Sequence, residues 1–530
     1  MRGIPFVLAF IAIACSVFGQ GSFPYSIEII PLEIPGIVGL HSYAFGESGG
    51  KILVIGGRRD GLHARQPFSA FSATMNNDAM IVIDPQAFQT WTVSLSTLPV
   101  GMQEQLQSTN SCFHQVGDTL YIAGGYAYSA TQGNHVTFPN LIAMHVGDAI
   151  EQVISGNLSS TVFRQLTDDF FAVTGGRMAH NGESFMIVGG HRFDGSYNPM
   201  GMPTYTQAYT NAVKMFRVIQ APNEFVAYAQ SAITDDFHLH RRDFNLIPYM
   251  TSAGVERYYI SSGVFQPTID LPFLYPVEID VDSVHAQTDF NQYLSNYHCP
   301  TMSLYDGSTS YAVFFGGMSQ YYYSGGELIQ DNLVPFTRTV SMVSRATNGN
   351  YSEAVLPIEM PGLKGSGAEF IPNANLPLTS NGMIVLSGMG TDTLDAGFIY
   401  GGIASSALNP FISNQTTLTN ADPVFYRVRL IRSPMMIEQL SPSITKQQFD
   451  IYPNPAYEII HLKLSEDIVQ GQYYLLSCDG KLLHSGNLSS LKREAGGYVY
   501  ELPSDVGDEL LEMIVVADAK QVLSSKFLKK

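Results

Sequence analysis

Basic side chains occupy two recurring kinds of position in this chain. Some stand where an apolar strand is expected to begin, and others follow a pair of small residues that ends such a strand. The predicted ligand contacts are His41, Arg58, Arg177, His191, Arg192, Arg241 and His298, with Arg59, Arg242 and Lys364 at similar positions. Because Arg guanidinium groups pair bidentately with carboxylates and phosphates, this set predicts a site for an anionic ligand.

The scarcity of basic residues makes this placement informative. The chain of 530 residues has 28 Lys and Arg against 46 Asp and Glu, a net charge of −18. Several arginines in one place would therefore form a local positive patch on an acidic protein. The alternative is structural, because Asp60, Asp194 and Asp243 are close in the sequence and could pair with these arginines. The sequence leaves both interpretations open.

Tyrosines follow the same small-residue pairs. They are Tyr126, Tyr128, Tyr197, Tyr205, Tyr209 and the run Tyr321, Tyr322 and Tyr323. Flat rings beside Arg and Asp could line a sugar or peptide site. Exposed tyrosines in long loops also commonly pack those loops, and the sequence favours this second role.

The elements that must position these side chains form a repeat. Six similar phrases end in a pair of small residues: GGKILVIGG at Gly57, DTLYIAGG at Gly125, ESFMIVGG at Gly190, ERYYISSG at Gly263, SYAVFFGG at Gly317 and NGMIVLSG at Gly388. Each apolar stretch predicts a strand, and its recurrence predicts a repeat architecture. A side chain at the strand end would collide with the neighbouring sheet, which explains the small residues.

The first repeat carries the fullest pattern. Asn77-Asp78, the Asp84-Pro85 turn and Trp91 follow its glycines, and here the chain resembles the kelch family of β-propellers. The resemblance implies an all-β fold with a six-bladed kelch-like β-propeller over residues 24–435. Later third strands are expected near Asn140, Asn211, Asn332 and Asp422. Since the sixth blade stops after its third strand, residues 26–34 are predicted to close the ring as its outer strand.

The C-terminal part resembles a second family. Tyr452, Pro453, Asn454 and Pro455, the turn Asp479, Gly480 and Lys481, and the final Lys529-Lys530 resemble the type A C-terminal sorting domain of the Bacteroidetes type IX secretion system. The resemblance implies that residues 449–530 fold as a small Ig-like β-sandwich and direct export across the outer membrane. Residues 436–448 are predicted to be a linker.

The N-terminus has the layout of a secretory signal. Arg2 precedes an apolar run, and the small residues Val17 and Gly19 predict that residues 1–19 form a signal peptide. Lipoprotein processing at Cys15 is the alternative. The mature chain has no predicted transmembrane segment, and its acidity argues against nucleic acid as a partner. We expect it to pass through the periplasm and to be secreted or held on the outer-membrane surface.

Enzymatic activity stays open at this point. Tyr297-His298 and Cys112 are similar to the copper ligands and the radical-cofactor cysteine of the galactose oxidase family, but the partner tyrosine is missing. The arginines also fit a kelch sialate mutarotase, in which Arg and Glu act on an acidic sugar, yet no Glu accompanies them in sequence. No metal or cofactor is predicted. Cys112 and Cys299 are expected to be buried thiols that form no disulfide.

These features predict an exported surface or secreted binding protein. The expected ligand is an acidic glycan or a peptide, and the type IX secretion machinery is the other expected partner. The rival interpretation is a carbohydrate-active enzyme of the mutarotase type that uses the same residues. The third interpretation is a structural or adhesive module without a pocket.

Overall fold

The computed structural model describes most of the chain, which divides into two compact units, Met1–Gln439 and Leu440–Lys530. The described residues are 19–199, 204–221, 224–432, 435–440, 447–464, 471–477, 482–494, 497–504, 506–507, 510–517 and 521–530. The predicted signal peptide lies outside them except for Gly19, and so does the predicted turn Asp479, Gly480 and Lys481.

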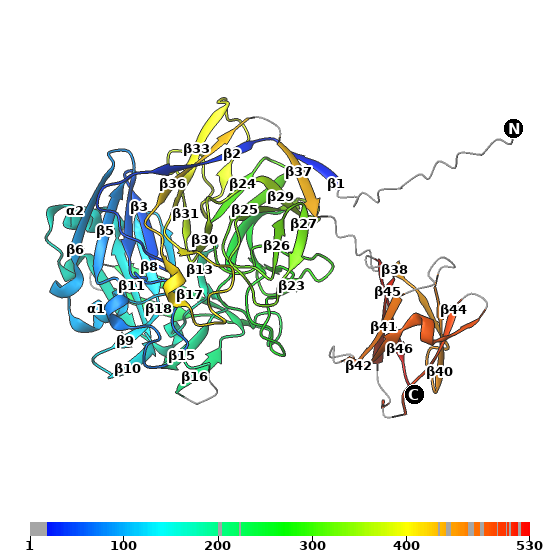
Figure 1. Ribbon diagram of the computed structural model, residues 1–530. Helices are drawn as coiled ribbons and strands as arrows, with labels where there is room; N and C mark the ends of the chain where they lie inside the picture. Colours follow the sequence, from blue (N-terminus) through cyan, green and yellow to red (C-terminus); the bar gives the residue numbers. More distant parts are fainter. Residues whose placement is uncertain are drawn as a thin grey trace. The chain divides into compact units, whose positions relative to one another are not determined.

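The first unit is all-β, and its sheets follow one another along the chain (Figure 1). Sheet one contains β3 (Ala44–Ser48), β4 (Lys51–Ile55), β5 (Ala79–Asp84) and β6 (Gln89–Ser94). Sheet two contains β7 (Cys112–Val116), β8 (Thr119–Ala123), β11 (Asn140–His145) and β12 (Phe163–Thr167). Sheet three contains β13 (Arg177–His180), β14 (Phe185–Val188), β17 (Ala212–Ala221) and β18 (Glu224–Ala229), with β19 (Ile233–Thr234) beside β17.

Three further sheets have the same antiparallel order. Sheet four contains β20 (Asn245–Met250), β21 (Glu256–Ser261), β22 (Val277–Ile279) and β23 (Val284–Ala286). Sheet five contains β24 (Thr301–Tyr305), β25 (Thr309–Phe315), β28 (Thr339–Ala346) and β29 (Tyr351–Glu359), extended by β32 (Ile384–Val385) at one edge and by β37 (Met435–Leu440) and β1 (Gly19–Phe23) at the other. Sheet six contains β31 (Glu369–Pro372), β33 (Thr393–Tyr400), β36 (Phe425–Ile431) and β2 (Ser26–Leu32).

Small hairpins and two helices complete the first unit. The loops between second and third strands carry β9 (Tyr126–Ser129) with β10 (Asn134–Thr137), β15 (His191–Gly195) with β16 (Tyr205–Tyr209), β26 (Tyr321–Ser324) with β27 (Glu327–Gln330), and β34 (Ile403–Ser405) with β35 (Thr419–Ala421). β30 (Leu363–Ser366), which precedes sheet six, pairs with β34. Helix α1 spans Val100–Leu106 and α2 spans Val146–Ser155. Among the described residues, neither helix is long and apolar enough to cross a membrane.

The N-terminal strand pairs where the sequence predicted. β2 lies antiparallel to β36, with Ser26 opposite Ile431 and Leu32 opposite Phe425. Figure 1 shows the blue strand β2 beside the yellow strands β33 and β36 of sheet six. Residues 436–440, predicted to begin the linker, belong instead to β37, which pairs with β1.

The glycine pairs bring consecutive sheets into hydrogen-bonding contact. The second residue of each pair donates its N–H to a carbonyl that precedes the first strand of the next sheet: Gly57 to Ser108, Gly125 to Val173, Gly190 to Arg241, Gly263 to Asn296, Gly317 to Lys364 and Gly402 to Leu40. A Cβ on Gly124 would collide with the carbonyl oxygen of Val173, and one on Gly401 with that of Leu40. Lack of bulk is therefore required by the neighbouring sheet, as predicted.

A closed ring of backbone hydrogen bonds joins residues that precede the six first strands. Asn110 donates to Ser42 (3.0 Å), Gly175 to Asn110 (3.0 Å), Asp243 to Gly175 (2.7 Å), His298 to Asp243 (2.7 Å), Gly367 to His298 (3.1 Å) and Ser42 to Gly367 (2.7 Å). We call these six residues the hub ring. The last bond returns to the residue from which the first one starts, so the sheets surround a common centre.

The predicted sixth repeat is wrong. The structure places the sixth glycine pair at Gly401-Gly402, after β33, and not at Ser387-Gly388. The apolar stretch before Ser387 contains β32, which pairs in parallel with β24 of sheet five. The third strand of sheet five also begins at Thr339, later than the expected Asn332, because the β26–β27 hairpin and a loop intervene.

The apolar core of the first unit lies between the faces of adjacent sheets. Between sheets one and two, Leu53 and Ile55 pack with Leu120 and Ile122. Between sheets five and six, Val313 and Phe315 are clustered with Ile399 and other residues of β33 and β36. Face-to-face packing of strongly apolar second and third strands explains the near-continuous apolar runs in the sequence.

The second unit consists of two sheets with a shared core. One contains β38 (Gln447–Gln448), β46 (Gln521–Leu528), β45 (Leu510–Ala517), β41 (Gly471–Ser477) and β42 (Leu482–Asn487); the other contains β39 (Asp450–Tyr452), β40 (Ile459–Lys463), β44 (Gly497–Glu501) and β43 (Lys492–Glu494). Leu462, Leu475 and Met513 belong to one buried cluster. Asn454 of the predicted motif accepts the N–H of Leu528 through Oδ1 at 3.0 Å, and the next residue but one, Ala456, accepts an N–H from Lys530, so the motif contacts the chain end.

Replacing Gly401 tests the corrected sixth repeat. Gly401→Ala should lower the free energy of unfolding of the first unit by at least about 2 kcal/mol more than Gly388→Ala does. Both glycines have positive φ, so the cost of backbone strain is similar, but only Gly401 faces a backbone carbonyl. Urea unfolding followed by fluorescence measures the difference. Equal costs for the two variants would contradict the assignment.

Candidate functional site

All six first strands line one cavity of about 420 Å³. Its wall includes Phe45 of β3, Phe113 of β7, Asn245 of β20 and Ser303 of β24. Arg177 of β13 and Glu369 of β31 lie at the strand starts nearest the hub ring, whereas Glu47 and Gly117 lie at the far strand ends. The cavity therefore extends away from the hub ring along the centre of the six sheets; we call it the hub cavity.

A cluster of one buried residue, His298, and two half-buried residues, Arg177 and Glu369, stands at the ring end of the hub cavity. Arg177 Nη1 lies 3.0 Å from Glu369 Oε1, and His298 Nε2 lies 3.2 Å from the same oxygen. Arg177 also donates to the carbonyl oxygen of Phe244. Although burial opposes ionisation, Arg177 and His298 hold the pKa of Glu369 at about 2. Burial, followed by the charge of Arg177, lowers the pKa of His298, so its imidazole is neutral at pH 7.

A second, much smaller chamber lies where this cluster meets the hub ring, to which His298 itself belongs. Its volume is about 20 Å³, and its lining includes Ser42, Asn110 and Asp243 of the ring together with Arg177 and Glu369. A chamber of this size has room for a single water molecule. The larger cavity is consequently the one able to hold an organic ligand.

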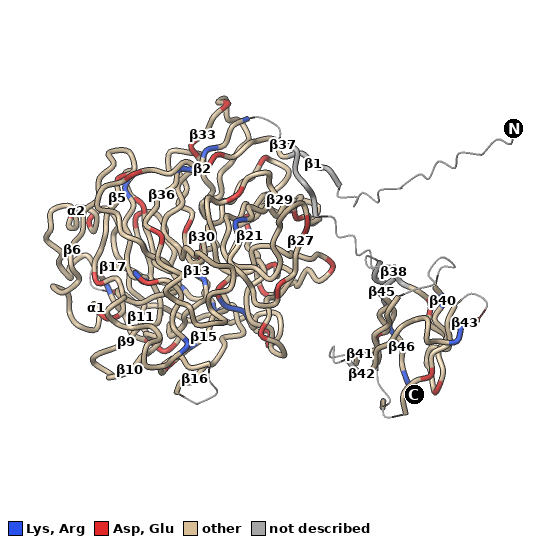
Figure 2. Tube along the Cα trace, in the orientation of Figure 1, with Lys and Arg blue, Asp and Glu red and all other residues tan. Residues whose placement is uncertain are grey.

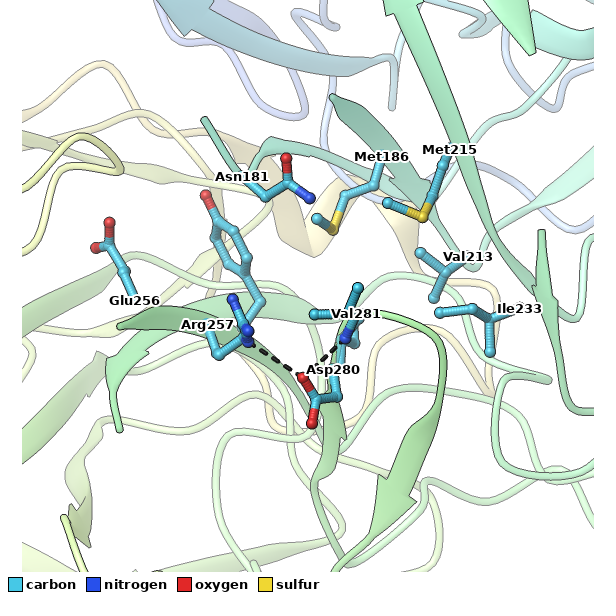
Figure 3. Close-up of a pocket in the computed structure, with 11 residues that line it drawn as sticks. Asn181, Met186, Val213, Met215, Ile233, Glu256, Arg257, Asp280 and Val281 are labelled. Carbon is cyan, nitrogen blue, oxygen red and sulfur yellow. Dashed lines mark hydrogen bonds and ion pairs between the residues drawn. The ribbon is translucent and has the colours of Figure 1, made fainter. Parts of the chain in front are cut away.

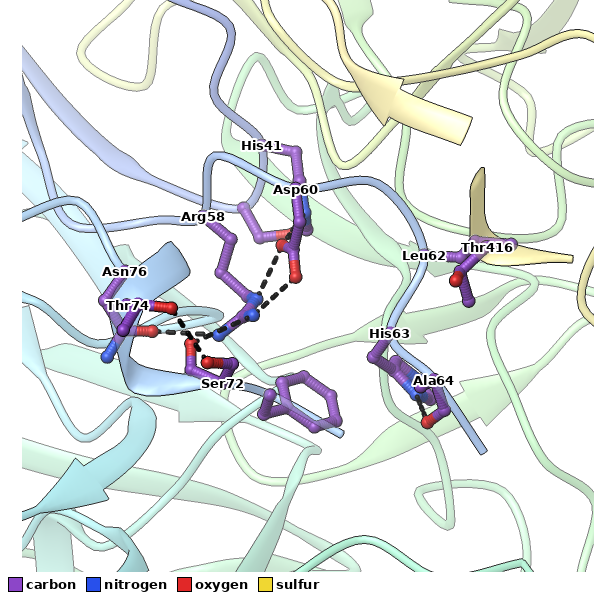
Figure 4. Close-up of polar contacts among 12 residues, drawn as sticks. His41, Arg58, Asp60, Leu62, His63, Ala64, Ser72, Thr74, Asn76 and Thr416 are labelled. Atoms are coloured by element: carbon purple, nitrogen blue, oxygen red, sulfur yellow. Dashed lines mark hydrogen bonds and ion pairs between the residues drawn. The ribbon is translucent and has the colours of Figure 1, made fainter. Parts of the chain in front are cut away.

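Two of the predicted contacts, His41 and Arg58, form a separate cluster with Asp60 (Figure 4). Arg58 donates to Asp60 through Nε (2.9 Å) and Nη2 (2.6 Å), and to Asn76 Oδ1 at 2.8 Å. His41 Nε2 lies 3.7 Å from Asp60 Oδ1. Burial opposes ionisation of Asp60, but His41 and Arg58 lower its pKa to about 2. Arg58 is therefore already fully engaged by protein groups.

The other predicted arginines are also occupied. Arg192 pairs with Asp194 at 2.7 Å and with Asp169 at 3.3 Å, near the surface. Arg241 is completely buried and donates to the carbonyl oxygens of His238, Ser262 and Tyr275. The remaining pairs are Arg59 with Asp78, Arg242 with Asp243, and Lys364 with Asp422. His191 is buried, with Nδ1 2.7 Å from Gln207 Nε2.

The predicted set does not converge on a single cavity. Of its seven members, the structure brings Arg177 and His298 together at Glu369, and His41 and Arg58 together at Asp60. His191, Arg192 and Arg241 each lie in surroundings of their own. Figure 2 likewise shows blue basic positions scattered among red acidic ones over the first unit.

Glu369 is the functional candidate that the sequence analysis missed. It begins β31 in the stretch GSGAEFIP, and it was missed because the sixth glycine pair was expected at Ser387-Gly388, too early in the chain. Searching for apolar residues before Gly401-Gly402 would have placed Glu369 at a strand start equivalent to Arg177.

A second carboxyl with a strongly shifted pKa, Glu353, lies elsewhere: burial raises its pKa to about 8, and it accepts N–H groups of Tyr293 and Leu294.

The predicted tyrosines and cysteines have structural contacts. Tyr205 stacks on Phe193, Tyr209 stacks on His240, and Tyr126 donates to the carbonyl oxygen of Gly195. Cys112 and Cys299 are both buried and free, as predicted, and Cys299 lines the hub cavity. Within the described residues, no group of three or more His, Cys, Asp or Glu side chains is placed to hold a metal ion.

Comparisons with known proteins add little detail. No model of a known protein family matches the chain. No curated protein matches it either. Among solved structures, one titled "Structure of YjhT" is similar at 12% sequence identity, covering 76% of this chain and 99% of that chain with a TM-score of 0.41.

The half-buried Arg177–Glu369 pair should make the stability of the protein sensitive to acid. Because the pKa of Glu369 is lowered from 4.5 to about 2, the pair contributes fully above about pH 4.5 and its contribution falls as pH decreases towards 2. Glu369→Gln should lower the free energy of unfolding at pH 7 by about 3 kcal/mol. It should also weaken the dependence of this free energy on pH below about pH 4.5.

Urea unfolding between pH 3 and pH 7 measures the effect. The control is Glu183→Gln, which removes a partner of Arg217 at the surface and should change stability by less than about 0.5 kcal/mol. If the stability of Glu369→Gln depended on pH in this range as that of the parent does, the assigned ion pair would be contradicted.

Proposed function

We propose that the first unit is a six-bladed kelch-like β-propeller that binds carbohydrate in the hub cavity. The closed hub ring supports six blades, because its six hydrogen bonds connect the residues that precede the six first strands and return to Ser42. β2 supports ring closure, since it supplies an N-terminal outer strand to the last sheet. This arrangement is the one expected from the kelch resemblance.

The observation that carries the binding proposal is the composition of the hub cavity wall. Phe45, Phe113 and Tyr258 offer flat or apolar surface, while Asn245 and Thr301 offer polar groups. Sugars have apolar ring faces and many hydroxyl groups, so they need both kinds of contact. The volume of about 420 Å³ also falls within the range of small-ligand sites.

The charges at the cavity favour a neutral sugar over the acidic glycan or peptide predicted from the sequence. Arg177 is the arginine of the predicted set that lines the hub cavity, and Glu369 already balances its charge. Glu47 adds a further acid to the wall. An anionic ligand would have to approach these carboxylates without a free arginine to compensate. Acidic glycans and peptides are therefore the second choice of ligand.

We propose that the chain is exported through its two terminal segments. Residues 1–19 are the proposed signal peptide, and the second unit is the proposed Ig-like sorting domain of a type IX secretion substrate. Two packed sheets and the contact between Ala456 and the last residues support a compact domain built around the motif. The mature protein is then secreted or displayed on the outer-membrane surface.

A mutarotase-type enzyme is the second candidate because Glu369 supplies the acid that the sequence lacked beside Arg177. The low pKa of Glu369 argues against it, since a carboxylate with a pKa of about 2 is a weak base at neutral pH. We therefore expect no acceleration of anomer exchange for N-acetylneuraminic acid or glucose by exchange NMR. Acceleration that Glu369→Gln abolishes would establish the enzyme instead.

Binding is tested by screening the mature chain on an array of neutral and acidic glycans, followed by calorimetry with the best ligand. The double variant Arg177→Met with Glu369→Gln removes both charges and leaves neither partner unpaired. We expect it to weaken binding at least about tenfold, because polar groups at the cavity end are lost.

The matched control neutralises an exposed pair, Arg217→Met with Glu183→Gln, and should bind as the parent does. Loss of binding in Arg192→Met, with the hub double variant unaffected, would move the site to the loops. Binding to no glycan at all would contradict the proposal.

A further inference from the structure

One connection in the first unit differs from its five counterparts. The first and second strands of sheets one to five are joined by short turns: residues 49–50, 117–118, 181–184, 251–255 and 306–308. In sheet six the corresponding segment, residues 373–392, has 20 residues and contains β32. Long connections inside a compact domain are uncommon and often serve as lids or binding loops. We call this segment the strap.

The base of the strap is firmly attached to sheet five. β32 pairs in parallel with β24, with Ile384 opposite Leu304 and Val385 opposite Tyr305. Leu386 donates its N–H to the Tyr305 carbonyl oxygen at 2.8 Å. Met383, Ile384 and Leu386 are buried, and the last two belong to the core cluster of sheets five and six. Strand pairing and apolar burial thus hold the base in place.

The tip of the strap, residues 379–382, is a small unit with hydrogen bonds of its own, and Leu378 before it packs against the core of sheets five and six. Leu378 and Ile384 form a bridge at its base. The N–H of Thr379 is bonded to the Met383 carbonyl oxygen, and that of Gly382 to the Thr379 carbonyl oxygen. These bonds are internal to the strap, so the turn can keep its shape if it moves.

A single carboxylate connects the tip to sheet four. Glu256, the first residue of β21, accepts hydrogen bonds from Thr379 Oγ1 (2.5 Å), Ser380 Oγ (3.1 Å) and Asn381 Nδ2 (2.6 Å). Figure 3 shows Glu256 at the edge of a crevice between sheets three and four, with its carboxylate pointing away from Met186 and Met215. The carboxylate is therefore directed to the strap rather than to the crevice.

The tip is also part of the wall of the hub cavity. Thr379, Ser380, Asn381 and Gly382 all line it, with Leu378 before them, at the side remote from the hub ring. The ring end is closed by the backbone ring and the Arg177–Glu369 pair. A ligand must therefore enter from the side on which the tip lies, and the position of the tip decides how wide that entrance is.

We propose that the strap tip is a lid over the hub cavity and that Glu256 is its latch. The attachments are unequal: the base, with Leu378, is held by strand pairing and apolar packing, whereas Glu256 is the residue outside the strap that bonds the tip. Loss of the three bonds to Glu256 releases the tip while the base keeps its place. The inference rests on the proposed function, because a lid has a purpose only if the hub cavity takes a ligand.

Cys299 allows a test that needs no knowledge of the ligand. Cys299 is buried but is among the residues that line the hub cavity, whereas Cys112 is buried and does not line it; burial raises the pKa of each thiol to about 12. The mature chain beginning at Gln20, with Cys478→Ser, is treated with the small neutral reagent methyl methanethiosulfonate. Modification at Cys299 and Cys112 is followed separately by peptide mass spectrometry.

Glu256→Ala should speed modification of Cys299 about tenfold, which is the change expected when one charged hydrogen bond's net contribution to closure is lost. Modification of Cys112 should not change. Glu256→Gln, which keeps an oxygen acceptor, should give an intermediate rate. Glu183→Ala, which removes an exposed Glu of sheet three, should behave as the parent.

Equal Cys299 rates in the parent and Glu256→Ala would overturn the lid. A parallel rise at Cys112 would also overturn it, because global loosening would then be the cause. The two proposals can fail separately. If Glu256→Ala speeds modification of Cys299 but no glycan binds, the proposed function is wrong. If a glycan binds but the modification rate does not change, the lid proposal is wrong.

Discussion

The closed hub ring is the constraint on which the rest of the first unit depends. Each of its six N–H groups donates to a residue that precedes the first strand of the neighbouring sheet, and Ser42 completes the circle with Gly367. Backbone groups at so crowded a centre need hydrogen-bond partners. The ring supplies these partners only when all six sheets are present in order. It therefore aligns the first strands that wall the hub cavity.

This closure also decides how the basic residues are used. Arginines near the centre lie close to buried carbonyl and carboxylate oxygens, and an unpaired buried charge is strongly unfavourable. Arg58 and Arg241 meet this requirement through Asp60 and three carbonyl groups respectively. Arg177 meets it through Glu369, from the opposite side of the ring. Residues that look like an anion site in sequence thus stabilise the centre of the fold.

The two ends of the central space have different properties. The ring end is closed by backbone hydrogen bonds and an ion pair, and it leaves room for one water molecule. The other end widens into the polar and aromatic hub cavity, where the strap is the one long first-to-second strand connection. The proposed ligand site and the proposed lid therefore lie at the end that ring closure leaves open.

The sequence alone determined the features that depend on neighbouring residues. Alternating apolar strands, small residues at their ends and the pairing of residues 26–34 follow from local pattern and from the count of strands. The sixth repeat was misplaced because NGMIVLSG and GFIYGG satisfy the same local pattern, and only contact with Leu40 distinguishes them. The meeting of Arg177 with Glu369 and of Glu256 with the strap was decided by tertiary structure. These partners are far apart in the chain, and only closure of the ring brings them within hydrogen-bonding distance.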